Sequence, residues 1–464
     1  MKDKFKNKLC DSKMTFEECE LTILRHAVDE TEKKQNIEKV NNESVQKMLD
    51  IVVNFIKKKK LVCYGGTAIN NILPESQQFY NKETEIPDYD FFSDNPIKHA
   101  KELADIYHKE GYKEVEAKSG MHYGTFKVFV NYIPIADITY LHPEIFAKVS
   151  KEALKIDGIQ YAPPNYLRMA AYLELSRPLG DVSRWEKVYK RLSLLNKNYP
   201  LKTKNCKPDI FSDEDNHPTS ELNTLLRDLL IKNKVVFFGG YSSFLYSKHM
   251  NADEGNKAKN ISEYDVLCED PETVGKEIMK SLKENEYKKL DLIKHKEIGE
   301  IIPLHYELTV AGKGKIFLFK PISCHSYNKI RVNKKNVQVA TIETILSFYL
   351  AFLYADMPYY NKDRLLCLSD SLLKVIEQNK LNERGILKRF TIQCYGKQKT
   401  LEDIRSEKSD KYKEFIEKKV DPESKEYRMW FLKYIPKGKQ GKTIKKTLKT
   451  NNKTLKSKPG LFLI

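Results

Sequence analysis

Two aspartates that alternate with aromatic residues, Asp88 and Asp90 in the run PDYDFF, are the residues of this sequence best placed to do chemistry. If the run is a β-strand, side chains two positions apart point to the same face, about 6.5–7 Å apart. Tyr89 and Phe91 then point to the opposite face, into a core. Two carboxylates side by side repel each other unless a cation lies between them. The spacing therefore predicts a pair of divalent metal ions, the arrangement that serves phosphoryl transfer.

A third carboxylate, Asp137, stands alone inside the apolar strand pattern IPIADITY, residues 133–140. A solitary aspartate in such a strand needs a partner or a metal ion to offset the cost of leaving water. Asp137 is therefore the third predicted metal ligand and catalytic residue.

A glycine turn precedes these acids. The apolar run 61–64 predicts a buried strand. Gly65, Gly66 and Thr67 then open a run of small and apolar residues that predicts a short helix. Glycine lets the backbone approach a phosphate closely, and the start of a helix offers free N–H groups to an anion. We expect these three residues to bind nucleotide, with Asn70 as a weaker candidate for contact with sugar or phosphate; a capping role within the helix is an equal alternative for Asn70.

Together, the motifs YGGTAIN, PDYDFF and IPIADITY resemble the DNA polymerase β-like nucleotidyltransferases, and most of all the catalytic subunits of poly(A) polymerases from large DNA viruses of the poxvirus and mimivirus kind. The gap between Thr67 and Asp88 is longer than is usual in that superfamily. The resemblance implies template-independent transfer of AMP from ATP to the 3′ end of mRNA. It also implies that Asp88, Asp90 and Asp137 hold two Mg²⁺ or Mn²⁺ ions.

The resemblance further implies RNA and ATP as binding partners and a cytoplasmic location in the viral factory of the infected host cell, with packaging in the virion as a further expectation. A homodimer is a guess that would substitute for a separate processivity factor. Two alternatives stay open. One is another nucleotidyltransferase acting on RNA ends, and the other is a catalytically inactive nucleotidyltransferase fold that serves as an RNA-binding scaffold.

Composition favours a folded protein with an acidic partner. The chain has 464 residues, enough for two or three domains, and a net charge of +17 with a pI near 9.1. Nucleic acid is the first candidate partner, a membrane surface the second, and a merely soluble basic protein the third possibility. No apolar run approaches the ~18–20 residues of a membrane-spanning helix, so we expect an intracellular, soluble protein. Of the two acidic partners we choose nucleic acid and expect no membrane partner.

The eight cysteines are scattered, without a C-x-x-C motif or paired Cys/His spacing. This pattern argues against a zinc site and against a disulfide framework, and it predicts an intracellular, reducing compartment.

The second half of the chain resembles the first. The run VVFFGG, residues 235–240, repeats the strand and glycine pair, and Glu263 and Asp265 repeat Asp88 and Asp90 at nearly the same separation. The run IPLHYELT, residues 302–309, resembles IPIADITY and puts Glu307 in the place of Asp137. We infer an internal duplication. Because Tyr241 replaces Thr67 and two of the three acids are glutamate, we expect a degenerate second copy.

The predicted fold class is α+β, with two tandem nucleotidyltransferase-like domains of mixed sheet and helices and helical segments at both ends. Within the first copy we expect helices at 96–110, 163–176 and 182–195 and strands near 112–118, 124–131 and 133–140. The two later helices carry possible nucleotide or primer contacts: Arg168, Arg184, Lys187 and Tyr189. The expected domains are a helical segment (1–60), the catalytic domain with its helical layer (61–196), a linker (197–216), the degenerate domain (217–435) and a basic disordered tail (436–464).

The C-terminal segments are expected to differ in order. Helical patterning around aromatic residues in 381–435 predicts packing on the second copy. From Lys437 to Lys458 there are nine lysines and no acid. Such a stretch cannot form a core, and it either binds RNA or only aids solubility.

Overall fold

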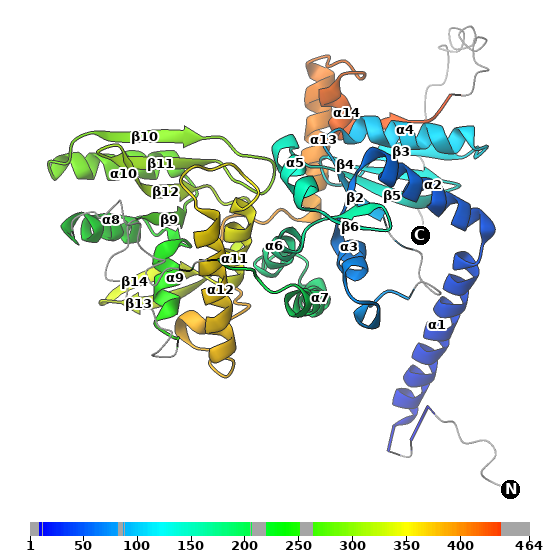
Figure 1. The fold of residues 1–464 in the computed structure, drawn as a ribbon, viewed down its shortest axis with the longest axis horizontal. Helices are drawn as coiled ribbons and strands as arrows, with labels where there is room; N and C mark the ends of the chain where they lie inside the picture. Colours follow the sequence, from blue (N-terminus) through cyan, green and yellow to red (C-terminus); the bar gives the residue numbers. More distant parts are fainter. Residues whose placement is uncertain are drawn as a thin grey trace, which may run out of the picture.

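The computed structural model describes residues 9–11, 13–81, 87, 89–204, 206, 220–250 and 263–437. Within these residues the chain forms two mixed eight-stranded sheets with helices packed on them, so the predicted α+β class is confirmed (Figure 1). Asp88, most of the expected linker and nearly all of the basic tail lie outside the described residues. No described helix is long and apolar enough to cross a membrane.

The first sheet is built from the predicted catalytic half and one short strand from the C-terminal end. Its strand pairs are mostly antiparallel, but β2 runs parallel to β5 and β1 parallel to β7. The strands in sheet order are β16 (Lys433–Tyr434), β3 (Val115–Ser119), β4 (Thr125–Val130), β5 (Ile133–Tyr140), β2 (Tyr89–Ser93), β1 (Val62–Cys63), β7 (Ile159–Tyr161) and β6 (Leu154–Ile156).

Two helices, α2 (Glu43–Lys59) and α4 (Pro96–Lys109), cover one face of this sheet. One apolar face of α2 is buried, and its first turn is capped by the Asn42 side chain, which accepts from two backbone N–H groups. Tyr107 of α4 donates a 2.6 Å hydrogen bond to the carbonyl of Met48, which joins the two helices. Beneath them, alternate residues of β4 such as Phe126 and Val128 are fully buried. The remaining residues of β4 therefore point to the opposite face, where the candidate site lies.

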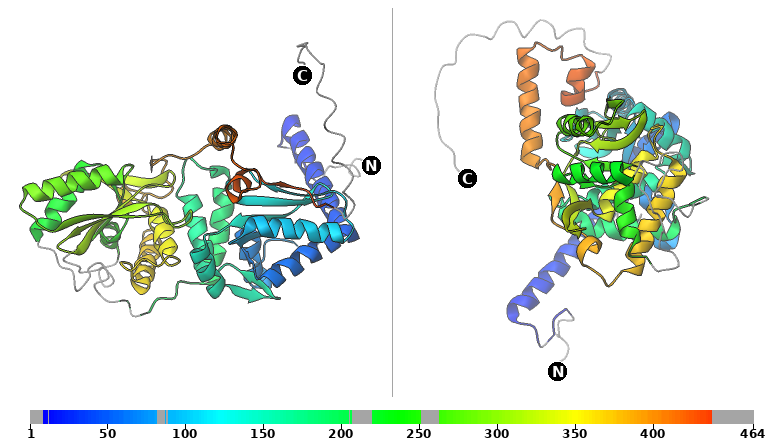
Figure 2. Two further views of the ribbon diagram at one scale, coloured as in Figure 1. Left: turned by 90° about the horizontal axis from the view of Figure 1, so that it is seen from above. Right: turned by 90° about the vertical axis from the view of Figure 1, so that its left-hand side faces the viewer.

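Other helices extend the first half. The long α1 (Phe16–Val40) projects away from the body of the protein (Figure 2). The short α3 (Gly65–Ile72) follows β1 directly, and α5 (Pro143–Glu152) follows β5. The expected helices around 163–176 and 182–195 are present as α6 (Pro164–Leu175) and α7 (Trp185–Asn198).

The second sheet repeats the strand order of the first. Numbered along the chain, β8 to β14 occupy the same relative positions as β1 to β7. The strands in sheet order are β10 (Leu290–His295), β11 (His305–Val310), β12 (Lys313–Phe319), β9 (Tyr264–Leu267), β8 (Val236–Phe237), β14 (Lys335–Ala340), β13 (His325–Val332) and β15 (Cys394–Tyr395). The helices of this half are α8 (Ser220–Lys232), α9 (Gly240–Ser247), α10 (Pro271–Glu284), α11 (Ile342–Phe352) and α12 (Lys362–Gln378).

The two halves meet through equivalent helices. Helices α6 and α11 lie side by side between the sheets (Figure 1). Tyr166 of α6 packs edge-to-face on Tyr354, with ring centroids 5.2 Å apart, and the N–H of Ser326 donates to the carbonyl of Ser176 at 2.8 Å. Because these groups are buried, the two halves form one continuous core.

The C-terminal helices do not pack where the sequence predicted. Helix α13 (Leu401–Glu417), helix α14 (Lys425–Phe431) and strand β16 return to the first sheet (Figure 1). Strand β16 pairs with β3, and Tyr434 donates a 2.6 Å hydrogen bond to Asp105 of α4. Lys408 of α13 donates to the carbonyl of Gly120 at 2.8 Å. The predicted packing on the second copy is therefore wrong, because helical periodicity shows which face of a helix is apolar but not which body it covers.

The cysteines also differ from expectation. Six of the eight form three disulfides, Cys10–Cys19, Cys206–Cys367 and Cys324–Cys394, and only Cys63 and Cys268 are free. The prediction of no disulfide framework is wrong. In two of these bridges, Cys206–Cys367 and Cys324–Cys394, the cysteines are separated by 161 and 70 positions in the sequence. Short spacing motifs cannot identify pairs so far apart.

This pairing predicts a simple thiol count. Alkylation of the protein unfolded without reductant should label two cysteines per chain, and all eight should react after reduction. Mass spectrometry of the intact chain measures both numbers. Eight labelled cysteines without reductant would show that the bridges do not form in the purified protein.

Candidate active site

Strand register places charged side chains in one row across the first sheet. Asp90 of β2 pairs directly with Asp137 of β5, Asp137 with Lys127 of β4, and Lys127 with Lys118 of β3. Directly paired residues point to the same face, and neighbouring strands lie about 4.8 Å apart. Two carboxylates and two ammonium groups therefore share the sheet face that α2 and α4 leave uncovered.

Lys127 neutralises the lone aspartate. Its ammonium group forms an ion pair and a hydrogen bond with the Asp137 carboxylate. The Asp137 side chain is only 18% exposed, so a charge partner is needed to offset its partial loss of water. The sequence predicted that need but not the residue that meets it, because Lys127 becomes a neighbour only through strand pairing.

The predicted alternation around Asp90 is confirmed for its described neighbours. Tyr89 and Phe91 are buried on the helix-covered side, whereas Asp90 is half-buried on the other side. Phe92 stacks on Tyr64 with ring centroids 3.8 Å apart, which anchors the strand next to the glycine turn. The placement of Asp88 beside Asp90 stays a prediction, since Asp88 lies outside the described residues.

The glycine turn lies against Asp90. The N–H of Tyr64 donates to the Asp90 carbonyl at 3.0 Å, and Gly65 follows with φ of +72°, a conformation that favours glycine. A Cβ on Gly65 would lie 3.3 Å from the Asp90 carboxylate. Thr67 is buried in the first turn of α3. The start of α3 is thus next to Asp90, on the side of that strand opposite to Asp137.

Arg191 and Tyr80 lie against this helix start, and no sequence motif identified either residue. A Cβ on Gly66 would lie 2.5 Å from the Tyr80 hydroxyl and 2.7 Å from Nη1 of Arg191. Arg191 donates to the Tyr80 hydroxyl at 2.7 Å, and its guanidinium lies 4.9 Å from the centre of the Phe79 ring. A guanidinium beside backbone N–H groups at a helix start is a suitable place for a phosphate.

Asn70 fixes residues 79 and 80, in the described part of the segment between the glycine turn and Asp90. It is buried, and its side-chain oxygen accepts from the N–H groups of Phe79 and Tyr80 at 2.8 and 2.9 Å. These bonds hold Tyr80 in front of Gly66, which gives the unusually long loop a role in shaping the site. The predicted contact of Asn70 with sugar or phosphate stays a prediction.

The other predicted contacts in α6 and α7 are distributed differently. Arg168 is buried; it donates to Asn196 at 2.7 Å and also to Asn165 and the carbonyl of Tyr199. Burial lowers the pKa of Arg168, which shows the cost of removing its charge from water. Arg184 is exposed and pairs with Glu174 at 3.4 Å, Lys187 is exposed, and Tyr189 packs against Phe390.

This contrast predicts different effects on stability. Arg168→Ala should lower the free energy of unfolding by about 2–4 kcal/mol, because a buried side chain is removed and its three half-buried hydrogen-bond acceptors lose their donor. The control is Arg184→Ala, in the short turn before α7. It should change the free energy of unfolding by no more than about 0.5 kcal/mol. Urea denaturation followed by circular dichroism measures both. Equal stability of the two variants would contradict a structural role for Arg168.

The equivalent positions in the second half are closed. Strand order equates β12 with β5 and β9 with β2, and the residue paired with Asp265 is Phe317. The expected match of Glu307 with Asp137 is therefore wrong. Glu307 lies on β11, pairs with Phe317 and occupies the position of Lys127. The short motif IPLHYELT resembled IPIADITY but folds one strand earlier.

The other two acids of the repeated motifs, Asp265 and Glu263, already have protein partners. Tyr360 donates to the Asp265 carboxylate, and Arg364 forms an ion pair with Glu263. Burial, together with the neighbouring Glu263 charge, raises the pKa of Asp265. A Cβ on Gly239 would clash with the Asp265 side chain, which therefore fills the space beside the start of α9. Nothing comparable to the charged row of the first sheet is left open among the described residues of this half.

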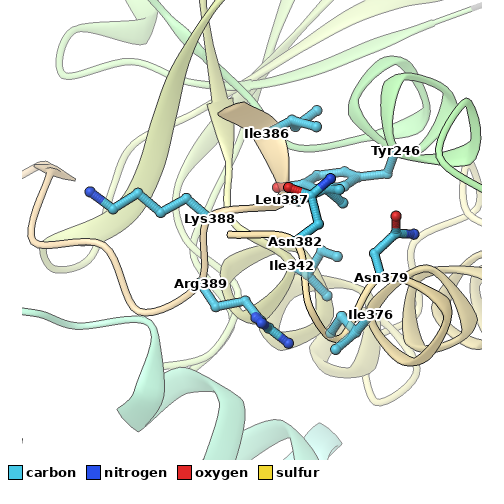
Figure 3. Close-up of a pocket in the computed structure, with 9 residues that line it drawn as sticks. All are labelled: Tyr246, Ile342, Ile376, Asn379, Asn382, Ile386, Leu387, Lys388 and Arg389. Carbon is cyan, nitrogen blue, oxygen red and sulfur yellow. The ribbon is translucent and has the colours of Figure 1, made fainter. Parts of the chain in front are cut away.

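The described cavity drawn in Figure 3 is not a second site of this kind. It lies in the second half between α12 and the segment after it, and its volume is only about 10 Å³, room for about one water molecule. Its lining includes Tyr246, Ile342 and Arg389. A nucleotide could not enter it.

The first-half carboxylates suit a hard divalent cation. Mg²⁺ and Mn²⁺ prefer carboxylate oxygens, and Asp90 and Asp137 present two of them from directly paired positions. Within the described part of the chain no group of three or more His, Cys, Asp or Glu side chains gathers. The third predicted ligand, Asp88, lies outside that part.

Comparisons with known proteins agree with these motifs. Residues 50–181 match the family described as "Poly(A) polymerase catalytic subunit". The chain is 33% identical to a protein of African swine fever virus (isolate Tick/Malawi/Lil 20-1/1983) and 30% identical to one of Acanthamoeba polyphaga mimivirus, each over 167 residues. Both carry the name "Putative poly(A) polymerase catalytic subunit". The alignments cover 35% of this chain and 35% and 28% of those relatives, so the chain matches about a third of their length.

The fold is also similar to a solved structure, "Crystal structure of the Megavirus polyadenylate synthase". The TM-score is 0.73 at 18% sequence identity, and the superposition covers 88% of this chain and 86% of that one. At this identity the likeness concerns the fold, and it extends over both halves of the molecule.

Proposed function

We propose that this chain, which belongs to the poly(A) polymerase catalytic subunit family of large DNA viruses, transfers AMP from ATP to the 3′ end of RNA without a template. The single observation that supports this most strongly is the row of charges on the first sheet, with Asp90 and Asp137 paired beside the start of α3. A carboxylate pair next to an anion-binding helix start suits phosphoryl transfer from a nucleoside triphosphate.

Asp88, Asp90 and Asp137 would hold two Mg²⁺ or Mn²⁺ ions. When bound, such ions neutralise charge on the triphosphate and make a hydroxyl a better nucleophile. Asp137 also would help to take up the proton of the RNA 3′-hydroxyl. Lys127 keeps Asp137 in position and balances its charge before substrates arrive.

The triphosphate would lie at the start of α3. Gly65 puts no side chain between the helix start and the Asp90 carboxylate, Thr67 follows in the first helical turn, and Arg191, which lies against Gly66, would supply a positive charge. This places the leaving pyrophosphate on the β1 side of Asp90. In-line displacement then requires the attacking hydroxyl on the other side, next to Asp137.

For the second half we propose a degenerate copy from an internal duplication, with a structural role. The repeated strand order supports the duplication. Phe317 at the third acid position, and the pairing of Asp265 and Glu263 with Tyr360 and Arg364, support the loss of activity. Action in the cytoplasmic viral factory and presence in the virion remain expectations from the resemblance to viral poly(A) polymerases, and the homodimer remains a guess that would substitute for a processivity factor.

The activity itself is tested with purified protein, Mg²⁺ or Mn²⁺, a short single-stranded RNA and each nucleoside triphosphate in turn. We expect long products with ATP alone, resolved on a denaturing gel. Extension by one or a few nucleotides of another kind would indicate a different nucleotidyltransferase of RNA ends. No extension with any nucleotide would favour the inactive RNA-binding scaffold and reject the proposal.

Equivalent acids in the two halves provide a matched pair of variants. Asp137→Asn and Asp90→Asn should each reduce extension at least about 100-fold, because a metal-binding charge is lost next to the reacting groups. Asp265→Asn should keep wild-type extension, since Tyr360 already occupies that carboxylate. Gel assays with circular dichroism as a folding control measure this. Full activity of Asp137→Asn would refute its assigned role.

Arg191 should affect the nucleotide more than the RNA. Arg191→Ala should raise the KM for ATP about 10- to 100-fold, because a hydrogen bond to a charged group is lost. The control is Lys190→Gln, whose side chain is exposed and pairs with Glu186 at 2.6 Å. An unchanged KM for ATP in Arg191→Ala, with the fold intact, would show that the triphosphate lies elsewhere.

A further inference from the structure

A groove of about 540 Å³ lies between the β3–β4 hairpin and the two C-terminal helices α13 and α14. This volume is within the range of ligand sites, roughly 300–1,000 Å³. We refer to it as the hairpin groove. Its lining residues are Lys118, Ser119, Gly120, Met121, Lys127, Arg405, Lys408, Ser409, Tyr412 and Phe431.

The lining is basic and aromatic. Four of its side chains are lysine or arginine, none is aspartate or glutamate, and two are aromatic. The rings of Tyr412 and Phe431 are 5.4 Å apart, edge to face, and the Tyr412 side chain is 47% exposed. Next to them Tyr123 and Trp430 form a second ring pair, 4.7 Å apart. Cations that follow a phosphate backbone, together with exposed rings on which bases stack, are the features of a site for single-stranded nucleic acid.

The hairpin groove runs directly into the charged row of the candidate active site. Lys118 and Lys127 line the groove, and Lys127 forms the ion pair with Asp137. Lys433 of β16 pairs with Lys118. From the β16 edge of the sheet inward, three lysines are therefore followed by the two carboxylates, Asp137 and Asp90. The end of the groove at Lys127 is therefore directly next to Asp137.

The groove and the start of α3 lie on opposite sides of the carboxylates. In sheet order, β3 and β4 are on one side of β5 and β2, and β1 with the following helix is on the other. Phosphoryl transfer places the attacking and leaving oxygens on opposite sides of phosphorus. If pyrophosphate leaves toward α3, the attacking 3′-hydroxyl must come from the groove side.

We propose that the hairpin groove holds the last nucleotides of single-stranded RNA and directs the 3′-hydroxyl toward Asp137. This inference rests on the proposed function for the direction of the strand. Lys118, Lys127 and Arg405 would contact the phosphates, and Tyr412 would stack on a base. Stacking needs an unpaired base, so the groove favours a single strand over a duplex.

The groove exists only because the C-terminal segment returns to the first sheet. Lys408 fixes α13 to the hairpin through Gly120 and lies 5.9 Å from the centre of the Phe431 ring, so it helps to build the groove wall. Arg405 has more freedom. Its side chain is 62% exposed, and its ion pair with Glu402 is long, at 3.8 Å. Arg405 and Tyr412 can therefore be changed with little effect on the fold.

The test measures binding of a short 5′-labelled single-stranded oligoadenylate by fluorescence anisotropy, without ATP. Tyr412→Ala should weaken binding about 5- to 150-fold. Arg405→Gln should weaken it and reduce the slope of log affinity against log salt by about 0.7, the value for one phosphate contact on a single strand. The controls are Lys413→Gln, on the same helix and paired with Asp410, and Tyr132→Ala, an exposed tyrosine on the β4–β5 turn. Both should bind as the wild type does.

The outcomes separate the groove from the activity. Where extension occurs, the Arg405 and Tyr412 variants should raise the KM for RNA and leave the KM for ATP unchanged. Where the wild type binds RNA but does not extend it, the proposed function fails, and the affinity measurements still decide the groove. Unchanged RNA affinity and salt slope in the folded Arg405→Gln/Tyr412→Ala double variant would overturn the inference. An equal loss for a duplex of the same sequence would do so as well.

Discussion

The close approach of two carboxylates on adjacent strands is the constraint on which the site depends. Asp90 and Asp137 occupy directly paired positions on adjacent strands, about 4.8 Å apart, and at that distance two carboxylates raise each other's free energy unless positive charge is supplied. The protein supplies part of it through Lys127, which pairs with Asp137. The start of α3 lies on one side of the carboxylates and a row of lysines on the other, so positive charge flanks the carboxylates on both sides. This arrangement supports both the proposed cation site and the proposed paths of ATP and RNA.

The second half keeps the strand order of the first but lacks the pair of carboxylates on adjacent strands. The order of strands is retained, but a buried phenylalanine replaces the third acid, and tyrosine and arginine side chains hold the other two. Those acids are satisfied by the protein itself and have no remaining need for a metal ion. The second half still contributes to the structure of the first. Its helix α11 packs on α6, and the chain that leaves the second half brings α13 and α14 back to the first sheet.

Much of the first half could be predicted from local pattern. Local sequence pattern predicted strands close to β2, β4 and β5 and helices close to α4, α6 and α7, and a lone charge in an apolar strand identified Asp137. What could not be predicted arises from pairing between distant segments. Lys127 as a partner, Arg191 in front of Gly66 and the disulfide between Cys206 and Cys367 all require the register of the folded chain. The match of Glu307 with Asp137 was wrong because two similar short motifs lie on strands that are not equivalent: Glu307 is on β11, the equivalent of β4, whereas Asp137 is on β5.

We propose that the carboxylates of the first half, and not those of the second, form a cation site for phosphoryl transfer. Binding of Mn²⁺, followed by electron paramagnetic resonance in the presence of a non-hydrolysable ATP analogue, measures this without any turnover. The account predicts that Asp90→Asn and Asp137→Asn weaken Mn²⁺ binding strongly, whereas Asp265→Asn leaves it unchanged. Wild-type Mn²⁺ binding in the first two variants, or a loss in the third, would contradict it.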